Sequence, residues 1–249
     1  MNHFVALSGG KDSTALWLRL LELTPQVPYQ AVITPTGDEL PEMIDHWKML
    51  SDMIDMPLRV VSCGESLDSL ERRQRALPNW RQRWCTRMLK IEPYEAFLAQ
   101  SAPAVSYVGL RADEEDRKGM EFRIDLPGVK IKFPMKSWGW RLTDVQGYLR
   151  GRGVSIPKRT DCGCCFFQTL GEWWELWKTH PAIYQTYVEK EAWVSEERGK
   201  ETTYRSPGRD TWPASLAALR DAFQTGHIPR GADVQGDMFH ESRCRTCTL

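Results

Sequence analysis

The chain has 249 residues, of which 41% are hydrophobic and 27% charged, a composition typical of a folded globular protein. Its 33 basic and 33 acidic side chains balance, which excludes a general electrostatic attraction to nucleic acid. No apolar run approaches the roughly 20 residues that span a bilayer, and the first residues lack the pattern of a signal peptide. We therefore expect a cytoplasmic protein with no membrane partner.

Short apolar runs alternate with helical segments through the first half of the chain. We expect strands at residues 4–7, 29–34, 58–61 and 105–110, and helices over 15–21, from Pro41 and over 91–98. A further strand at 129–133 and a short helix from Thr143 to Gly151 or Gly153 follow. Strands separated by helices in this way predict an α/β fold with a doubly wound, mainly parallel sheet.

The alternation of strands and helices changes after about residue 120. Beyond Thr160 the sequence is rich in cysteine, tryptophan and helix-forming residues. We expect an α/β domain that holds the ligand over residues 1–155, and a smaller helical, cysteine-rich lobe over residues 156–249.

A glycine-rich loop joins the first expected strand to the first helix. Its glycines let backbone N–H groups approach an anion, and the helix that follows adds its positive end. Lys11 adds a full positive charge, and Asp12 is suited to orient the loop or to hold Mg²⁺. The spacing differs from that of a Walker A loop, because aspartate follows the lysine. The loop predicts a phosphate-binding site made by Ser8, Gly9, Gly10, Lys11, Asp12 and Ser13.

These six residues resemble the signature of the PP-loop ATP pyrophosphatases. Residues 36–42, 84–93 and 109–117 are similar to motifs of one branch of that superfamily, the phosphoadenylylsulfate reductase-like proteins. The third motif departs from the branch at Glu115, where serine is usual. The resemblance implies an adenine nucleotide alpha hydrolase-like fold, which binds ATP with Mg²⁺ beyond the carboxyl ends of the strands.

The matching motifs assign functional residues in this chain. Cations are expected around the polyphosphate, where arginine can bind two oxygens at once, and they are Arg87, Lys90, Arg111 and Arg117. The resemblance places further nucleotide contacts at Thr36, Gly37, Asp38, Glu39 and Gly109, with Asp38 or Glu39 holding Mg²⁺ or contacting the adenosine. Catalytic roles are expected for Lys11, Asp12, Arg111 and Cys85.

Two Cys-x-x-Cys pairs lie in the second half of the chain, Cys162 with Cys165 and Cys244 with Cys247. Two such pairs are typical of a tetrahedral metal site, and either Zn²⁺ or a 4Fe–4S cluster accepts four thiolates. The resemblance favours the 4Fe–4S cluster, because related DNA-phosphorothioation ATPases and some sulfonucleotide reductases hold one. Structural Zn²⁺ is the alternative. Cys164 is a spare thiol that is an alternative to Cys162 as a ligand.

Two further cysteines and one loop complete the candidates. Cys85 lies between Arg83 and Arg87, whose charges would stabilise a thiolate and make it a sulfur carrier or nucleophile. The alternative is a half-buried cysteine packed against a neighbouring tryptophan. We expect Cys63 to be a core residue at a strand end, and the arginine-containing loop over residues 205–213 to contact substrate.

The leading interpretation is an ATP pyrophosphatase that adenylates an acceptor for sulfur transfer. A cysteine desulfurase would donate the sulfur, and DNA or another nucleic acid would accept it. One alternative is a sulfonucleotide reductase, although Cys244 and Cys247 are assigned to metal and leave no separate nucleophile near the end of the chain. A second alternative is a non-catalytic nucleotide-sensing subunit.

Overall fold

The computed structural model describes residues 1–114, 126–230 and 232. Its centre is a five-stranded sheet in the order β3-β2-β1-β4-β5, in which every neighbouring pair is parallel. β1 (Asn2–Ala6) pairs with β2 (Tyr29–Ile33) and β4 (Ala104–Tyr107), while β3 (Arg59–Val60) and β5 (Val129–Lys132) form the edges. The expected parallel α/β sheet is confirmed.

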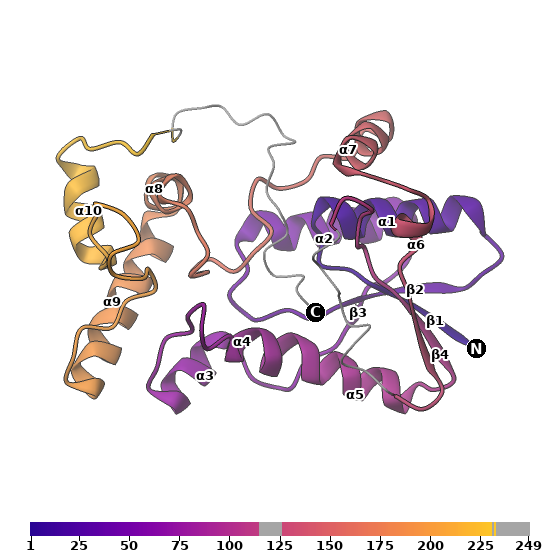
Figure 1. Ribbon diagram of the computed structural model, residues 1–249, viewed down its shortest axis with the longest axis horizontal. Coiled ribbons are helices and arrows are strands. Elements are labelled where there is room, and N and C mark those ends of the chain that lie inside the picture. Colours follow the sequence, from indigo (N-terminus) through magenta and orange to yellow (C-terminus); the bar gives the residue numbers. More distant parts are fainter. Residues whose placement is uncertain (115–125, 231, 233–249) are drawn as a thin grey trace.

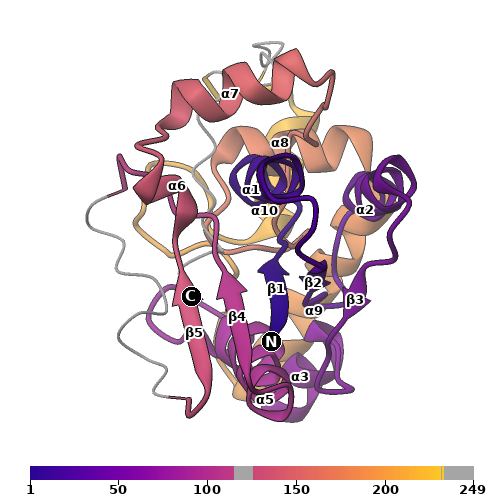
Figure 2. The same cartoon turned by 90° about the vertical axis from the view of Figure 1, so that its right-hand side faces the viewer.

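Helices lie on both sides of this sheet (Figures 1 and 2). One side carries α1 (Lys11–Leu23), α2 (Pro41–Ile54), α6 (Pro134–Ser137) and α7 (Leu142–Gly151). The other carries α3 (Leu67–Gln74), α4 (Trp84–Thr86), a π-helical turn η1 (Arg87–Ile91) and α5 (Glu92–Gln100). Neighbouring strand residues point to opposite faces, so Val5 packs in the core with Leu16 of α1, whereas Phe4 packs in a separate core with Leu98 of α5.

The strand after α5 ends earlier than the sequence indicates. β4 stops at Tyr107, because the chain then turns across the start of α1. A Cβ atom on Gly109 would lie 3.0 Å from the backbone nitrogen of Ser13 and 3.1 Å from the carbonyl carbon of Asp12. Glycine is required there, since two backbones meet with no room for a side chain.

The expectation that Cys63 is a core residue is wrong. β3 pairs with β2 over only two residues and leaves Cys63 in the loop that follows. Cys63 is therefore exposed to solvent. Because this edge strand is so short, residues 62–64 are not held against the sheet and stay exposed.

Three helices form the C-terminal part of the described chain: α8 (Leu170–Thr179), α9 (Pro181–Arg198) and α10 (Leu216–Gln224). A reciprocal pair of hydrogen bonds between Thr169 and Glu172 begins α8, and proline occupies the first position of α9. Trp173 and Tyr184 share one apolar core with Leu70 and Trp84 of the preceding part. The domain boundary near residue 155 stays a prediction, because apolar side chains from before and after it pack in this one core. No helix of the described ranges is long and apolar enough to cross a membrane.

Candidate functional site

The glycine-rich loop over residues 8–13, called the phosphate loop below, is closed by its own serines. The Ser8 N–H donates to Ser13 Oγ at 3.2 Å, and the two serine Oγ atoms lie 2.9 Å apart. Gly9 has a φ of 82°, and a Cβ atom there would collide with side chains of α2. The loop therefore depends on glycine both for its conformation and for its fit against α2.

A cavity, called the loop cavity, opens at the carboxyl ends of β1, β2 and β4. This is where a doubly wound sheet places its ligand. The cavity brings together predicted residues from four separate segments, namely Ser8, Gly10, Asp12, Ser13, Glu39, Lys90 and Gly109. Trp47, Tyr94, Thr160, Asp161 and Cys162 also line it.

Arg111 is held beneath the phosphate loop by carboxylates. Its Nη1 donates to both carboxylate oxygens of Asp12, at 3.0 and 2.9 Å, and its Nε donates to Asp113 at 2.9 Å. Lys11 Nζ lies 3.5 Å from the same Asp12. Arg111 is 4% exposed, so the guanidinium positions Asp12 and does not line the loop cavity.

A second cavity, called the cysteine cavity, adjoins the first. Four cysteines line it, and they are Cys85, Cys162, Cys164 and Cys165. The rest of its wall is half apolar, formed by Leu67, Pro78, Phe166 and Phe167, and half polar, formed by Thr36, Arg83, Thr86 and Lys90. Lys90 and Cys162 belong to both cavities, so these two residues form the partition between the phosphate loop and the cysteines.

The thiols of the cysteine cavity are buried in their protonated form. Burial raises the pKa of Cys162 to about 12, and it raises the pKa values of Cys164 and Cys165 well above the ordinary value. A bound cation would reverse this, since metals bind the thiolate. In the residues that the structure describes, no three His, Cys, Asp or Glu side chains are arranged as a ready metal site. The donor type nevertheless fits a thiophilic metal or cluster.

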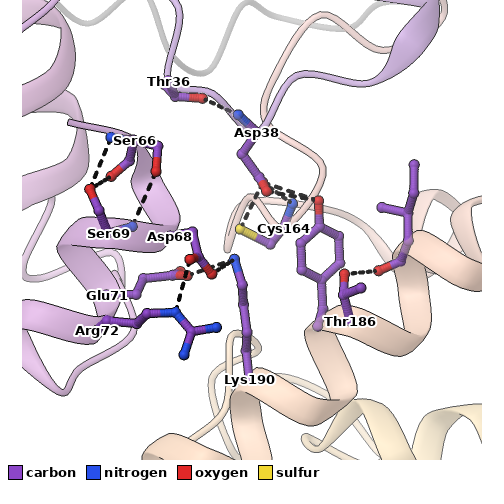
Figure 3. A network of polar contacts seen from close by, with 12 residues as sticks. Thr36, Asp38, Ser66, Asp68, Ser69, Glu71, Arg72, Cys164, Thr186 and Lys190 are labelled. Atoms are coloured by element: carbon purple, nitrogen blue, oxygen red, sulfur yellow. Dashed lines mark hydrogen bonds and ion pairs between the residues drawn. The ribbon is translucent and has the colours of Figure 1, made fainter. Parts of the chain in front are cut away.

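Asp38 faces the cysteines instead of the loop cavity. The thiol of Cys164 donates to Asp38 Oδ2 at 3.2 Å, and the Tyr187 hydroxyl donates to both carboxylate oxygens at 3.1 Å. Figure 3 shows Asp38 and Cys164 pointing toward one another above Lys190 of α9. Burial raises the pKa of Asp38. The predicted nucleotide or Mg²⁺ contact at Asp38 is therefore replaced by a contact that fixes the cysteine loop.

Glu39 holds the turn that carries Asp38. Its carboxylate accepts hydrogen bonds from the Thr36 N–H at 2.7 Å and the Gly37 N–H at 2.9 Å. Thr36 Oγ1 in turn lies 3.2 Å from Cys162 Sγ. Thr36 thus borders the cysteine cavity, Gly37 lines neither cavity, and Glu39 reaches the loop cavity.

Two predictions around Cys85 need correction. Burial raises the pKa of Cys85, so the flanking arginines do not make it a thiolate. Arg87 is turned outward into an exposed ion pair with Glu92, and it does not line the loop cavity. The half-buried alternative describes Cys85 better, because it packs at the edge of the apolar core that contains Trp84. It does, however, face the other cysteines.

The arginines of the loop over residues 205–213 are structural. Arg205 is 1% exposed and donates to both carboxylate oxygens of Asp210 at 3.0 and 2.8 Å. Arg209 donates to the backbone carbonyl of Gln168 at 3.0 Å. Neither side chain lines either cavity, and the expected substrate contact stays a prediction.

Sequence reasoning missed the segment just before the cysteines. Thr160 and Asp161 complete the loop cavity, and Arg159 lies buried behind them. Their position directly before Cys162 was the available signal. Tyr187 and Lys190 of α9 were missed because nothing local in the sequence relates them to Asp38. The predicted residues Arg117, Cys244 and Cys247 lie outside the described residues.

The sequence matches the phosphoadenosine phosphosulfate reductase domain over residues 2–205. The chain belongs to this family. No curated protein sequence matches it significantly. The resemblance to the phosphoadenylylsulfate reductase-like branch is thereby confirmed.

Similar solved structures include two proteins of low sequence identity. A phosphoadenylyl-sulfate (PAPS) reductase from Candida auris, in a phosphate complex, is 15% identical with a TM-score of 0.46, over 63% of this chain and 75% of that one. The U34-tRNA thiolase NcsA from Methanococcus maripaludis, with its [4Fe-4S] cluster, is 17% identical with a TM-score of 0.49, over 100% of this chain and 80% of that one.

Proposed function

We propose that this family member is an ATP pyrophosphatase that adenylates an acceptor for sulfur transfer. The contact between the two cavities carries the proposal, because Lys90 and Cys162 line both. A phosphate ester activated at the phosphate loop would lie beside a group of thiols. A protein that only hydrolysed or sensed ATP would not need thiols beside the phosphate loop.

The phosphate loop provides the groups that ATP requires. Backbone N–H groups at the start of α1, the hydroxyls of Ser8 and Ser13, and the charge of Lys11 suit the phosphates. Asp12 and Glu39 are carboxylates on the cavity wall, the ligand type that Mg²⁺ prefers. Bound Mg²⁺ would neutralise charge on the pyrophosphate that leaves.

The chemistry has two displacements. An oxygen of the acceptor attacks the α-phosphorus of ATP, and the bond to the β-phosphate bridging oxygen breaks to release pyrophosphate. A thiol reductant releases sulfide from the persulfide that a desulfurase delivers, and is itself oxidised to a disulfide. The sulfide then replaces the adenylated oxygen, and AMP leaves with that oxygen. Lys90 lines both cavities, which supports a role for its positive charge in stabilising negative charge in both steps.

Cys162 and Cys165, with Cys244 and Cys247, are the proposed ligands of a 4Fe–4S cluster, or of structural Zn²⁺. When bound, a cluster would supply thiolate-held iron that can carry sulfur, whereas zinc would only fix the fold. Cys85 faces the same cavity and is a further candidate ligand, while Cys164 donates to Asp38. We propose a cysteine desulfurase as sulfur donor and DNA or another nucleic acid as acceptor.

The deciding experiment measures pyrophosphate release from ATP and Mg²⁺ with mixed nucleic acid as acceptor. Wild-type protein should release pyrophosphate, and Lys11→Ala should abolish release, while the exposed Lys200→Ala serves as the matched control. ATP binding without release would favour the nucleotide-sensing alternative. Anaerobic purification adds a second readout, since an iron–sulfur protein absorbs visible light and a zinc protein is colourless.

The family match favours one second candidate, a sulfonucleotide reductase. Such an enzyme would release sulfite from phosphoadenylylsulfate with thioredoxin as reductant. Sulfite release by the wild-type protein, in the absence of ATP-dependent pyrophosphate release, would replace the proposed function with this one.

A further inference from the structure

Arg159 carries a buried charge that the proposed chemistry has not used. The residue lies three positions before Cys162 and is 7% exposed. Its Nη2 donates to the Cys162 carbonyl at 2.9 Å and to Asp161 Oδ1 at 3.3 Å. Its Nε and Nη1 have no hydrogen-bond partner in the part of the chain that the structure describes. Guanidinium N–H groups buried without acceptors are costly, so a partner for them is expected.

The carboxylates near Arg159 do not account for these two nitrogens. Asp161 already accepts from Nη2. Glu172 accepts from the Thr169 N–H at 2.6 Å and the Thr169 hydroxyl at 2.9 Å, where it begins α8. The guanidinium contacts the cysteine loop itself, because Nη2 donates to the Cys162 carbonyl. Nε and Nη1 are therefore buried beside this loop without a hydrogen-bond acceptor in the described residues, and an anion at the cysteines would supply one.

A purely structural role explains only part of the arrangement. Pinning the Cys162 carbonyl needs one nitrogen, and Nη2 supplies it. Gln168 Nε2 also approaches the Cys162 carbonyl, at 3.5 Å, and donates to the neighbouring carbonyl of Gly163. The neutral Gln168 side chain is therefore a second group that holds the cysteine loop. The positive charge of Arg159 is not needed for that purpose.

We propose that Arg159 is a positioning residue that supplies the counter-charge for anionic sulfur at the cysteine centre formed around Cys162 and Cys165. The inference rests on the proposed metal-binding role of these cysteines and does not depend on ATP chemistry. When thiolates form on metal binding, the protein interior gains negative charge. Arg159 compensates that charge from behind the cysteine loop, on a side that lines neither cavity.

The test titrates Co²⁺ into reduced, metal-free protein and follows the thiolate-to-cobalt absorption in competition with a chelator. Arg159→Gln removes the charge and should weaken Co²⁺ binding about 10-fold or more, as loss of a metal-site supporting residue does. Arg159→Lys keeps the charge and should restore most of the affinity. Arg209→Gln is the matched control, because Arg209 holds the carbonyls of Phe166 and Gln168 in the same segment.

The outcomes separate charge from structure. Equal weakening by Arg159→Gln and Arg159→Lys, or equal weakening by Arg209→Gln, would overturn the proposal, as would unchanged binding by Arg159→Gln. If Arg159→Gln does not fold, Arg159→Met fills the same volume and replaces it in the test, and failure of both to fold without metal would also count against the proposal. Wild-type protein without thiolate–cobalt absorption would overturn it as well. Failure of the proposed function is seen separately, as absent pyrophosphate release.

Discussion

Arg111 Nη1 lies 3.0 and 2.9 Å from the two carboxylate oxygens of Asp12, and this contact joins the turn after β4 to the first turn of α1. Both side chains are only 5% exposed. The pair therefore fixes the phosphate loop from below, and the residue that the family motif suggested as a phosphate contact acts through the aspartate.

Loss of Arg111 is the first prediction. Arg111→Met removes one of the two ion pairs that Asp12 makes in the described chain and leaves that carboxylate buried beside Lys11, so the free energy of unfolding should fall by about 3–5 kcal/mol. Urea unfolding measures the change. Arg19→Met is the control, since its pair with Glu22 is partly exposed and should contribute at most about 1 kcal/mol. Similar losses in the two variants would contradict the structural role given to Arg111.

The second prediction concerns the close approach at Gly109. A Cβ there meets backbone atoms of Ser13 and Asp12 at 3.0–3.1 Å, so Gly109→Ala must push the turn away from α1. We expect a loss of about 1–3 kcal/mol in stability, as in other overpacked sites, together with weaker ATP binding in equilibrium dialysis. Gly147→Ala in α7 meets nothing within 4 Å and should instead stabilise by about 0.5–1 kcal/mol. Unchanged ATP affinity in Gly109→Ala would refute the predicted coupling.

The phosphate loop and the sheet were within reach of the sequence because both depend on local patterns. Short apolar runs predict strands, and Ser8 to Ser13 are near enough in the chain for glycine and serine chemistry to define their conformation. Errors at strand ends came from backbone contacts between distant segments. Gly109 is the clearest case, since no residue near it in the sequence indicates that its backbone lies against the start of α1.

The cysteine site was predicted only in part, because its geometry depends on long-range packing. Asp38 and Cys164 are 126 residues apart, and the hydroxyl of Tyr187 reaches Asp38 across 149 residues. The motif therefore identified Asp38 as functional without showing which cavity it faces. Cys85 belongs to the same group for a similar reason, since packing against α3 and the C-terminal helices brings it to Cys162.

The third prediction is a pH dependence carried by Glu71. Burial raises its pKa to about 7 from the ordinary 4.5, against the opposing effects of Lys190 and Tyr204, while the Asp38 charge raises it further. The folded state binds more protons than the unfolded state between these values. The contribution of Glu71 to stability is therefore present below about pH 4.5 and declines as pH rises through 7, by up to about 3 kcal/mol.

Urea unfolding at several pH values checks this decline. Glu71→Gln stays neutral, so its stability should fall less than that of wild-type protein between pH 4.5 and 7. Part of the decline should remain, because burial also raises the pKa of Glu191 to about 7. Glu189→Gln removes an exposed carboxylate on α9, the helix that carries Glu191, and should retain the wild-type profile. A Glu71→Gln profile parallel to wild type would argue against a buried, neutralised Glu71.

The last prediction compares two buried tyrosine hydroxyls. Tyr187 donates to both oxygens of Asp38 at 3.1 Å, whereas Tyr94 shares a neutral hydrogen bond of 2.7 Å with Ser106. Hydrogen bonds to a charged group contribute about 1.5–3 kcal/mol and neutral ones about 1 kcal/mol. Tyr187→Phe should therefore destabilise more than Tyr94→Phe in urea unfolding.

A second readout ties this difference to the cysteine loop. Asp38 also accepts from the Cys164 thiol, so loss of the Tyr187 hydroxyl should loosen that loop and speed alkylation of Cys164. Peptide mass mapping after a timed iodoacetamide pulse measures the rate. Tyr94 packs in a separate core that includes strand residues of the sheet, so Tyr94→Phe should leave the rate unchanged. If the two variants alkylate Cys164 equally fast, Tyr187 does not act through Asp38, and the carboxylate alone holds the thiol.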